Sequence, residues 1–467
     1  MVHLKHTKIV PRLIPTALLL GLFLGGCHWV IVPKGEPEER AKAAQAERPF
    51  AIPVNKRPLP NLAASASLPA VLEYAFNSNG EIEAAYREWR AAIERVPQAG
   101  ALPNARLEFS YMFSPDNLKS FGSALDGIRL MLTQEFPGKG KRKRRAEMAL
   151  DEAQAAGERF RAAKYRLQKQ VVQAYAEVVL NEALRRQTSE TLRLLRQSHE
   201  VAVHRFHGLP AEAPAGDLTD LRKIEVEIET AESEQRSLQL MRGKRIADLN
   251  GVLNRPPDST PGKVELPVIQ RPAESDADLF ARAIQTNPDL AALRKDIEAR
   301  GAAQTLAELE KRPDYSVSGG MEQLSPVVSL GMSLPLNRAR IRAGIAEALA
   351  VRQAAEARFR AVSSDVQARV VMALAAIRDA ERILADYQEQ IVPKTRELLQ
   401  TQITTYGSGG GDLLDILDTE RLLVDFQTLT LRAEADRLRY LAELEEVVGE
   451  DLFGFVPADQ KSQEVGP

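Results

Sequence analysis

Four short segments alternate between apolar and polar residues, the pattern of β-strands with one apolar face. Leu107, Phe109, Tyr111 and Phe113 fall on one side of the first segment, and a second begins at Ile128. A matching pair recurs late in the chain. We therefore predict strands at about 105–114, 127–136, 313–322 and 327–336, and strands of about ten residues can cross a bilayer at a tilt.

Long stretches with apolar residues at steps of three and four follow each strand pair. Residues 140–207 and 337–406 have this coiled-coil spacing and predict helices, each roughly 100 Å long at 1.5 Å per residue. Pro393 lies inside the second stretch and predicts a kink or helix junction. Shorter helices should return at about 217–250 and 412–449, and others should precede the strands at about 66–99 and 275–311.

The same parts occur twice, in the same order. The segment from Asn79 to Ala85 pairs with the segment from Asn287 to Leu293, and Phe206-His207-Gly208 pairs with Thr405-Tyr406-Gly407. Units of this size are much longer than solenoid repeats. The chain is therefore interpreted as repeat 1 at 65–270, repeat 2 at 271–455 and a tail at 456–467.

The N-terminus has the pattern of an exported lipoprotein. Basic residues precede an apolar run that ends near Gly26, which predicts a signal peptide at 1–26. Leu24-Gly25-Gly26-Cys27 resembles a lipobox, so Cys27, the single cysteine, is the expected lipid attachment residue. His28 follows the cysteine, at the position where an aspartate favours retention in the inner membrane. Because that aspartate is absent, the resemblance implies the outer membrane. The proline-rich residues 27–64 predict an extended, lipid-anchored arm.

Composition narrows the function classes. Lys and Arg number 62 against 64 Asp and Glu, so the net charge of −2 gives no sign of a nucleic-acid partner. The aromatic content of 5% is low for several separately packed cores and favours helices. After the N-terminal run, no segment has the roughly 20 apolar residues of a spanning helix, so a membrane crossing must use strands.

Several motifs together resemble the TolC-like outer-membrane efflux family. They are Leu249-Asn250-Gly251 with Arg255-Pro256, the strand ends at 134–139 and 333–336, and the turn from Tyr406 to Asp418. The match covers about 65–455, and the lipobox with Ala101-Leu102-Pro103 is most similar to the lipoprotein branch that serves resistance-nodulation-division pumps, a CusC/CzcC-like branch.

This resemblance implies a mainly α fold with a membrane β part. The expected assembly is a homotrimer, in which an α-barrel of long coiled-coil helices in the periplasm joins a shared 12-stranded β-barrel. The number of strands also favours a trimer, because the four strands of one chain cannot close a barrel, whereas three chains supply about twelve. The implied partners are a periplasmic adaptor (membrane fusion protein), an inner-membrane pump and outer-membrane lipid. The implied function is export of small solutes or heavy-metal cations.

The family's periplasmic tip pattern fits Tyr406, Gly409, Asp415 and Asp418 without a gap. Asp415 and Asp418 are three residues apart and share a helix face, and threefold symmetry would turn each into a ring that binds cations. Alternatively, both acids simply favour the helix dipole. The predicted pore gate is Tyr406, Asp415, Asp418 and Asp220; the predicted adaptor-contact tip is Gly208, Thr219, Gly407 and Gly409. Gly411 replaces a basic residue common in the family, which argues against a salt-bridge lock.

Other chemical groups carry weaker signals. His199, His204 and His207 are close in sequence, but no further ligand is placed to complete a metal site with them. Six basic residues surround the start of the first long helix and suggest an anionic partner, such as inner-leaflet phosphates or acids of a neighbouring protomer, or a solvated turn. They are Lys139, Lys141, Arg142, Lys143, Arg144 and Arg145.

No catalytic motif, cofactor motif or zinc spacing is present, so we expect neither an enzyme nor a cofactor other than the lipid on Cys27. Two alternatives remain open from the sequence. The same fold serves as a duct in type I protein secretion, and a periplasmic coiled-coil spacer would have hairpins that never enter a membrane. The sequence does not name the transported substrate or the cognate pump.

Overall fold

The computed structural model describes residues 30–113, 127–207, 215–267, 269, 275–322, 325–408 and 410–455, without the side chains of 204–207, 215–218 and 220. The chain forms two compact units. Unit 1 falls within Met1–Ala44, Arg87–Glu158 and Ala292–Arg360, and unit 2 within Gln45–Tyr86, Arg159–Ala291 and Ala361–Pro467. Long helices such as α6 (Lys141–His207) contribute residues to both units.

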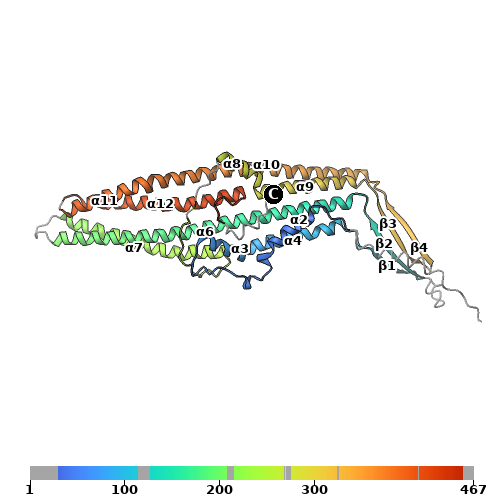
Figure 1. Ribbon diagram of the computed structural model, residues 1–467, viewed down its shortest axis with the longest axis horizontal. Helices are drawn as coiled ribbons and strands as arrows, with labels where there is room; N and C mark the ends of the chain where they lie inside the picture. Colours follow the sequence, from blue (N-terminus) through green and yellow to red (C-terminus); the bar gives the residue numbers. More distant parts are fainter. Residues whose placement is uncertain are drawn as a thin grey trace, which may run out of the picture. The chain divides into compact units, whose positions relative to one another are not determined.

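Unit 1 contains one antiparallel sheet in the order β1-β2-β3-β4, with its strands side by side in Figure 1. The strands are β1 (Arg106–Tyr111), β2 (Ile128–Phe136), β3 (Asp314–Glu322) and β4 (Ser325–Ser333). All four predicted strands are confirmed, with bounds that differ by a few residues at some ends. Strands from the two repeats meet where β2 pairs with β3.

The register gives the sheet one apolar face. Phe109 lies opposite Leu130, Leu130 opposite Met321, and Val317 opposite Leu330. Many of these side chains are solvent-exposed, with 66% of Phe109 and 82% of Leu330 accessible. The other face is mostly polar apart from Met131 and Val327, and the Thr133 and Ser318 hydroxyls hydrogen-bond across it at 2.8 Å. The predicted alternation of apolar and polar residues is therefore confirmed.

The arm predicted as extended is instead partly helical. Residues Glu36–Ala46 form α2, and short 3-10 helices follow at Arg48–Phe50 and Val54–Lys56. Between the prolines the sequence is rich in Ala, Glu, Lys and Arg, which are strong helix formers. In unit 1, Trp89 Nε1 donates to Glu39 Oε1 at 2.8 Å and Arg40 binds Glu94 at 2.6 Å, both on α4 (Gly80–Gly100). These contacts fix α2, and the prediction of an extended arm was wrong here.

Each helix predicted before a strand pair is in fact two helices. The first half has α3 (Leu68–Ser78) and α4, and the second has α8 (Asp276–Thr286) and α9 (Pro288–Leu309). An asparagine causes both breaks. Asn79 Oδ1 accepts from the Glu81 and Ile82 N–H groups while Nδ2 donates to Val252 O at 3.0 Å. Asn287 likewise caps Leu290 and donates to Val447 O at 2.7 Å. Both asparagines belong to unit 2, so the duplication extends to individual hydrogen bonds.

The paired coiled-coil helices lie largely in unit 2. The unbroken 140–207 helix is confirmed as α6, and its return partner is α7 (Ala215–Val252). In the second half, α10 (Arg338–Ile383) leads through a π-helix at Leu384–Ile391 into α11 (Val392–Gly407), which lies beside α12 (Leu413–Val448) in Figure 1. The junction forms directly before Pro393, as predicted, because proline cannot donate an N–H to the helix.

The predicted coiled-coil positions are largely buried. Phe160, Leu167, Val171 and Val178 of α6 are all buried in unit 2, as is Val370 of α10. Within the described residues, no helix has an apolar stretch long enough to cross a membrane.

Candidate functional site

The turn between α11 and α12 is tight and closed by its own backbone. The Gly410 N–H donates to Thr405 O at 3.0 Å, and the Asp412 side chain caps α12 by accepting from Leu414 N at 3.0 Å. Gly411 has φ of +78°, a left-handed conformation that favours glycine over residues with a Cβ atom. Glycine adopts this conformation without the strain that a Cβ atom would add.

Asp415 and Asp418 lie in the first turns of α12, and both side chains are exposed. Asp418 Oδ1 accepts from Arg421 at 3.1 Å, so one of the two acids already has a partner. Asp415 stands in the first turn, where a negative charge interacts favourably with the helix dipole. The shared exposed face that the three-residue spacing predicts is therefore present.

Arg421 is a tip residue that the sequence analysis missed. Besides Asp418, its guanidinium pairs with Glu227 of α7. The ion pair joins the return helices of the two repeats within unit 2. Although Gly411 removes the basic residue expected in the turn, Arg421 supplies a positive charge two helical turns further on. Arg421 lies three residues after Asp418 and so shares its helix face. This spacing in the sequence could have predicted the ion pair between them.

Tyr406 has different surroundings from the exposed acids. Its side chain is 8% exposed and belongs to an apolar cluster with Leu192 and Leu195 of α6 and Ile224 of α7. Leu413, Ile416 and Leu417 complete the same cluster from α12. Tyr406 thus packs the tip of unit 2, and the structure does not bring it together with Asp415 and Asp418 on one exposed face.

The remaining predicted tip residues are only partly described. Thr219 and Gly407 are exposed, and no atom lies within 4 Å of the position that a Cβ of Gly407 would take. Gly208, Gly409 and the side chain of Asp220 lie outside the described residues, as do Cys27 and the signal peptide.

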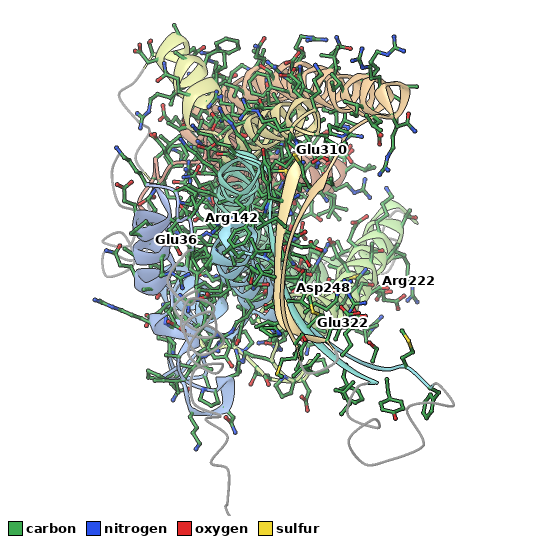
Figure 2. The ribbon with its side chains drawn as sticks, turned by 90° about the vertical axis from the view of Figure 1, so that its right-hand side faces the viewer. Glu36, Arg142, Arg222, Asp248, Glu310 and Glu322 are labelled. Carbon is green, nitrogen blue, oxygen red and sulfur yellow. The ribbon has the colours of Figure 1, made fainter. Side chains whose placement is uncertain are left out.

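The basic segment at the start of α6 is mostly satisfied within unit 1. Lys141 is 1% exposed, and its Nζ lies 3.0 Å from Asp314 and 3.4 Å from Glu310. Arg142 donates to Gly100 O at 2.8 Å, and Arg144 pairs with Glu147 at 2.7 Å. Figure 2 shows Glu310 near one end of the sheet and Glu322 near the other end. Acids and carbonyls of the same chain, rather than a separate anionic partner, therefore take up much of this charge.

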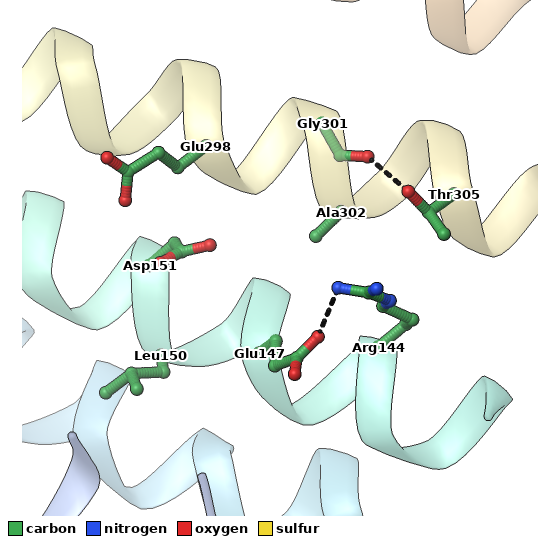
Figure 3. A pocket seen from close by; sticks show the side chains of 8 residues that line it. All are labelled: Arg144, Glu147, Leu150, Asp151, Glu298, Gly301, Ala302 and Thr305. Atoms are coloured by element: carbon green, nitrogen blue, oxygen red, sulfur yellow. Dashed lines mark hydrogen bonds and ion pairs between the residues drawn. The ribbon is translucent and has the colours of Figure 1, made fainter. Parts of the chain in front are cut away.

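Beside this segment, a cavity of about 300 Å³ lies between α6 and α9 (Figure 3). Its walls carry Glu147, Asp151 and Glu298, and Arg144 pairs with Glu147 of the same helix. Burial is the main cause that raises the pKa of Asp151 to about 6, and the negative charge of Glu298 adds to it. Among the described residues, no three His, Cys, Asp or Glu side chains are grouped so that they could hold a metal ion.

Of the three neighbouring histidines, only His199 has a described side chain. His199 Nε2 lies 3.9 Å from Glu225 Oε1, beyond hydrogen-bond distance. The side chains of His204 and His207 lie outside the described residues. A metal role for the three histidines is therefore neither supported nor tested by these contacts.

A family comparison identifies the second repeat. Residues 279–450 match the family model described as outer membrane efflux protein. These residues belong to the outer membrane efflux protein family. The efflux-family domain runs from α8 to the end of α12 and includes β3, β4, Tyr406, Asp415 and Asp418.

Solved structures share the fold of a larger part of the chain. The outer-membrane channel OprN has 17% identity and a TM-score of 0.69, over 82% of this chain and 90% of that chain. VceC from Vibrio cholerae has 18% identity and a TM-score of 0.67, over 82% and 96%. CusC has 17% identity and a TM-score of 0.68, over 86% and 97%. Among curated proteins, sequence comparison found no match. The TolC-like fold that the sequence predicts is confirmed.

Proposed function

We propose that this protein is the outer-membrane channel of a tripartite efflux system. The efflux-family domain and the TolC-like fold support this role. The chain would act as a homotrimer, dock a periplasmic adaptor and an inner-membrane pump, and export small solutes or heavy-metal cations. It would be a transport duct and not an enzyme.

The sheet of unit 1 carries the proposal. One whole face presents apolar side chains such as Leu107, Phe109, Leu330 and Met332, all more than half exposed. A contiguous apolar surface of this kind is unfavourable in water and favourable against hydrocarbon. The polar opposite face, with Ser316, Thr133 and Ser329, suits a water-filled interior.

The open edges of the sheet require more strands. Among the described strands, β1 and β4 each pair on one side only, and an unpaired strand edge is very costly in lipid. Four strands are fewer than the roughly eight of the smallest barrels. Because β1 and β4 run antiparallel in an even-numbered sheet, β4 of one copy can pair with β1 of the next. Three copies would give a closed barrel of about twelve strands.

The exposed acids give the periplasmic end of the duct its chemistry. In a trimer, Asp415 and Asp418 would repeat around the axis and concentrate negative charge, which favours cations. Arg421 offsets part of that charge, because it pairs with Asp418 and Glu227. The tip would therefore attract cations most strongly at Asp415. A lipid on Cys27 would hold each chain at the inner leaflet of the outer membrane.

Purification and bilayer recording test the proposal directly. The protein should need detergent for extraction, have the mass of a trimer when the bound detergent is subtracted, and form discrete conducting channels in planar bilayers. A protein that stays soluble after removal of the lipid anchor, and that forms no channels, would instead be a periplasmic spacer. Deletion of the gene should abolish export of small solutes from cells, and the plasmid-borne gene should restore it. This result would distinguish efflux from protein secretion.

A further inference from the structure

A cavity of about 620 Å³ lies within unit 2, among α6, the π-helix, α11 and α12. Its lining combines polar residues with a group of aliphatic side chains. The aliphatic group includes Leu194 of α6, Val392, Leu399 and Ile403 of α11, and Leu423 and Leu431 of α12. This volume is in the range of pockets that hold drug-sized molecules.

Glu420 places a buried acid beside these aliphatic side chains. It is 6% exposed, and its Oε1 atom is buried without a hydrogen-bond partner among the described residues. A smaller cavity of about 260 Å³ is also lined by Glu420, together with Glu227. Burial, and then the charge of Glu227, raises the pKa of Glu420 to about 7. A buried carboxylate without a counter-charge is costly, so an approaching cation would be strongly favoured.

The positively charged side chains around Glu420 have other partners or lie at exposed positions. Arg421 is engaged by Asp418 and Glu227, and Glu190 pairs with Arg193 at 2.6 Å. Arg186 and Arg396 line the cavity from exposed positions. The charged groups that line the two cavities beside Glu420 are, by element, Arg186 and Glu190 of α6, Glu227 and Glu234 of α7, Arg396 of α11, and Arg421, Asp425 and Glu434 of α12.

We propose that this cavity binds a lipophilic organic cation, such as a quaternary or protonated amine, with its positive charge at Glu420. The apolar groups of the ligand would lie against Leu399, Leu423 and Leu431, and the carboxylate would gain the counter-charge that it lacks. The site is distinct from the exposed acids of the tip. It goes beyond the proposed channel function, since binding here does not require conduction.

Two ions of nearly the same shape and opposite charge provide the test. Tetraphenylphosphonium and tetraphenylborate are titrated separately into the full-length protein in detergent, with the wild-type and variant proteins at equal detergent concentration so that uptake by micelles cancels. We expect the wild-type protein to bind the phosphonium and not the borate. Glu420→Gln, which keeps the shape and removes the charge, should weaken phosphonium binding at least tenfold. The matched control Glu190→Gln, at an exposed position of the same cavity, should change it less than twofold.

The pH dependence gives a second readout. The phosphonium charge does not titrate, so its affinity for the wild-type protein should fall about tenfold from pH 8 to pH 5.5, as Glu420 becomes protonated. Burial also raises the pKa of Glu434, and Glu420→Gln shows how much of the dependence belongs to Glu420, because most of it should vanish in that variant. A cavity-filling variant, Leu431→Trp, should reduce binding without changing the charge.

Equal phosphonium affinity in the wild-type protein and in a folded Glu420→Gln variant would overturn the proposal, as would equal binding of the two ions. Should Glu420→Gln fail to fold, unchanged phosphonium binding in Leu431→Trp would overturn it as well. Planar-bilayer conductance of the same wild-type sample reports the channel function separately, so loss of one result leaves the other standing.

Discussion

Replacing Lys141 with methionine should weaken the junction between α6, α9 and β3 in unit 1. The Lys141 ammonium is nearly inaccessible and lies 3.0 Å from Asp314 and 3.4 Å from Glu310. Asp314 also accepts from the Gly138 N–H at 2.6 Å, where the chain passes from β2 into α6. Methionine keeps most of the apolar stem of lysine, so the substitution tests the charge rather than the packing.

The expected loss of stability depends on how deeply each member of the ion pair is buried. Removing one member of a fully buried ion pair costs about 3–5 kcal/mol. Here the acids are only half-buried, with 42% of the Asp314 side chain and 51% of the Glu310 side chain accessible, so solvent screens the charges left behind. We therefore expect a loss of about 1–3 kcal/mol in the free energy of unfolding. The control, Lys143→Met, removes an exposed ammonium group that lies 3.6 Å from Glu147, which keeps Arg144 as a partner. It should cost less than about 0.5 kcal/mol.

Thermal unfolding in detergent, followed by circular dichroism at 222 nm at one scan rate, measures the difference. Lys141→Met should unfold at a clearly lower temperature than both the wild-type protein and Lys143→Met. In the double variant Lys141→Met/Asp314→Asn, the combined loss should be smaller than the sum of the single losses, because the two residues interact. Equal midpoints for Lys141→Met and Lys143→Met would refute the reasoning, since burial would then have no effect on the strength of the pair.

Three further substitutions test other parts of the molecule. Leu330→Arg, on the apolar face of β4, should reduce insertion into the outer membrane by an energy of about 2–4 kcal/mol if it lies near the bilayer midplane, and unchanged recovery of trimers from outer membranes would contradict this. Asp415→Asn/Asp418→Asn should lose cation selectivity and block by multivalent cations in planar bilayers without unfolding, because exposed helix-start acids contribute only about 0.3–1 kcal/mol each; retained selectivity would make them ordinary helix-start charges. Cys27→Ser should abolish fatty-acid labelling and weaken membrane retention while the barrel still folds, and labelling that persists would rule out this residue as the lipid site.

The sequence predicted the features that depend on local periodicity. Alternation around Phe109 and Leu330 located the strands, and spacing through Val171 and Val370 located the coiled-coil helices. It failed where one side chain overrides the helical pattern. Asn79 ends a helix because its amide bonds to a carbonyl more than 170 residues away, and such a partner is invisible in a local window.

The tip shows the same limit. Exposure of Asp415 and Asp418 follows from their spacing, whereas the pairing of Arg421 with Glu227 requires knowing which helix lies beside α12. Buried acids are harder still. Glu445 is fully buried and accepts from the N–H groups of Leu452 and Phe453 at 2.8 and 2.7 Å, yet it stands among many acidic residues of α12. No feature of its sequence neighbourhood distinguishes it from an exposed glutamate.

The π-helix at Leu384–Ile391 interrupts the second long helix but not the first, although the matching segments of the two helices are equal in length. Phe160 and Phe359 are separated by the same number of residues as Phe206 and Thr405, so no residue is gained or lost between these positions. A π-turn takes up more residues than an α-turn, however, so the side chains after it point in other directions than in an unbroken helix. The two repeats are therefore not exact copies in three dimensions, because residues of α11 face other directions around their helix than the residues of α6 at the matching positions.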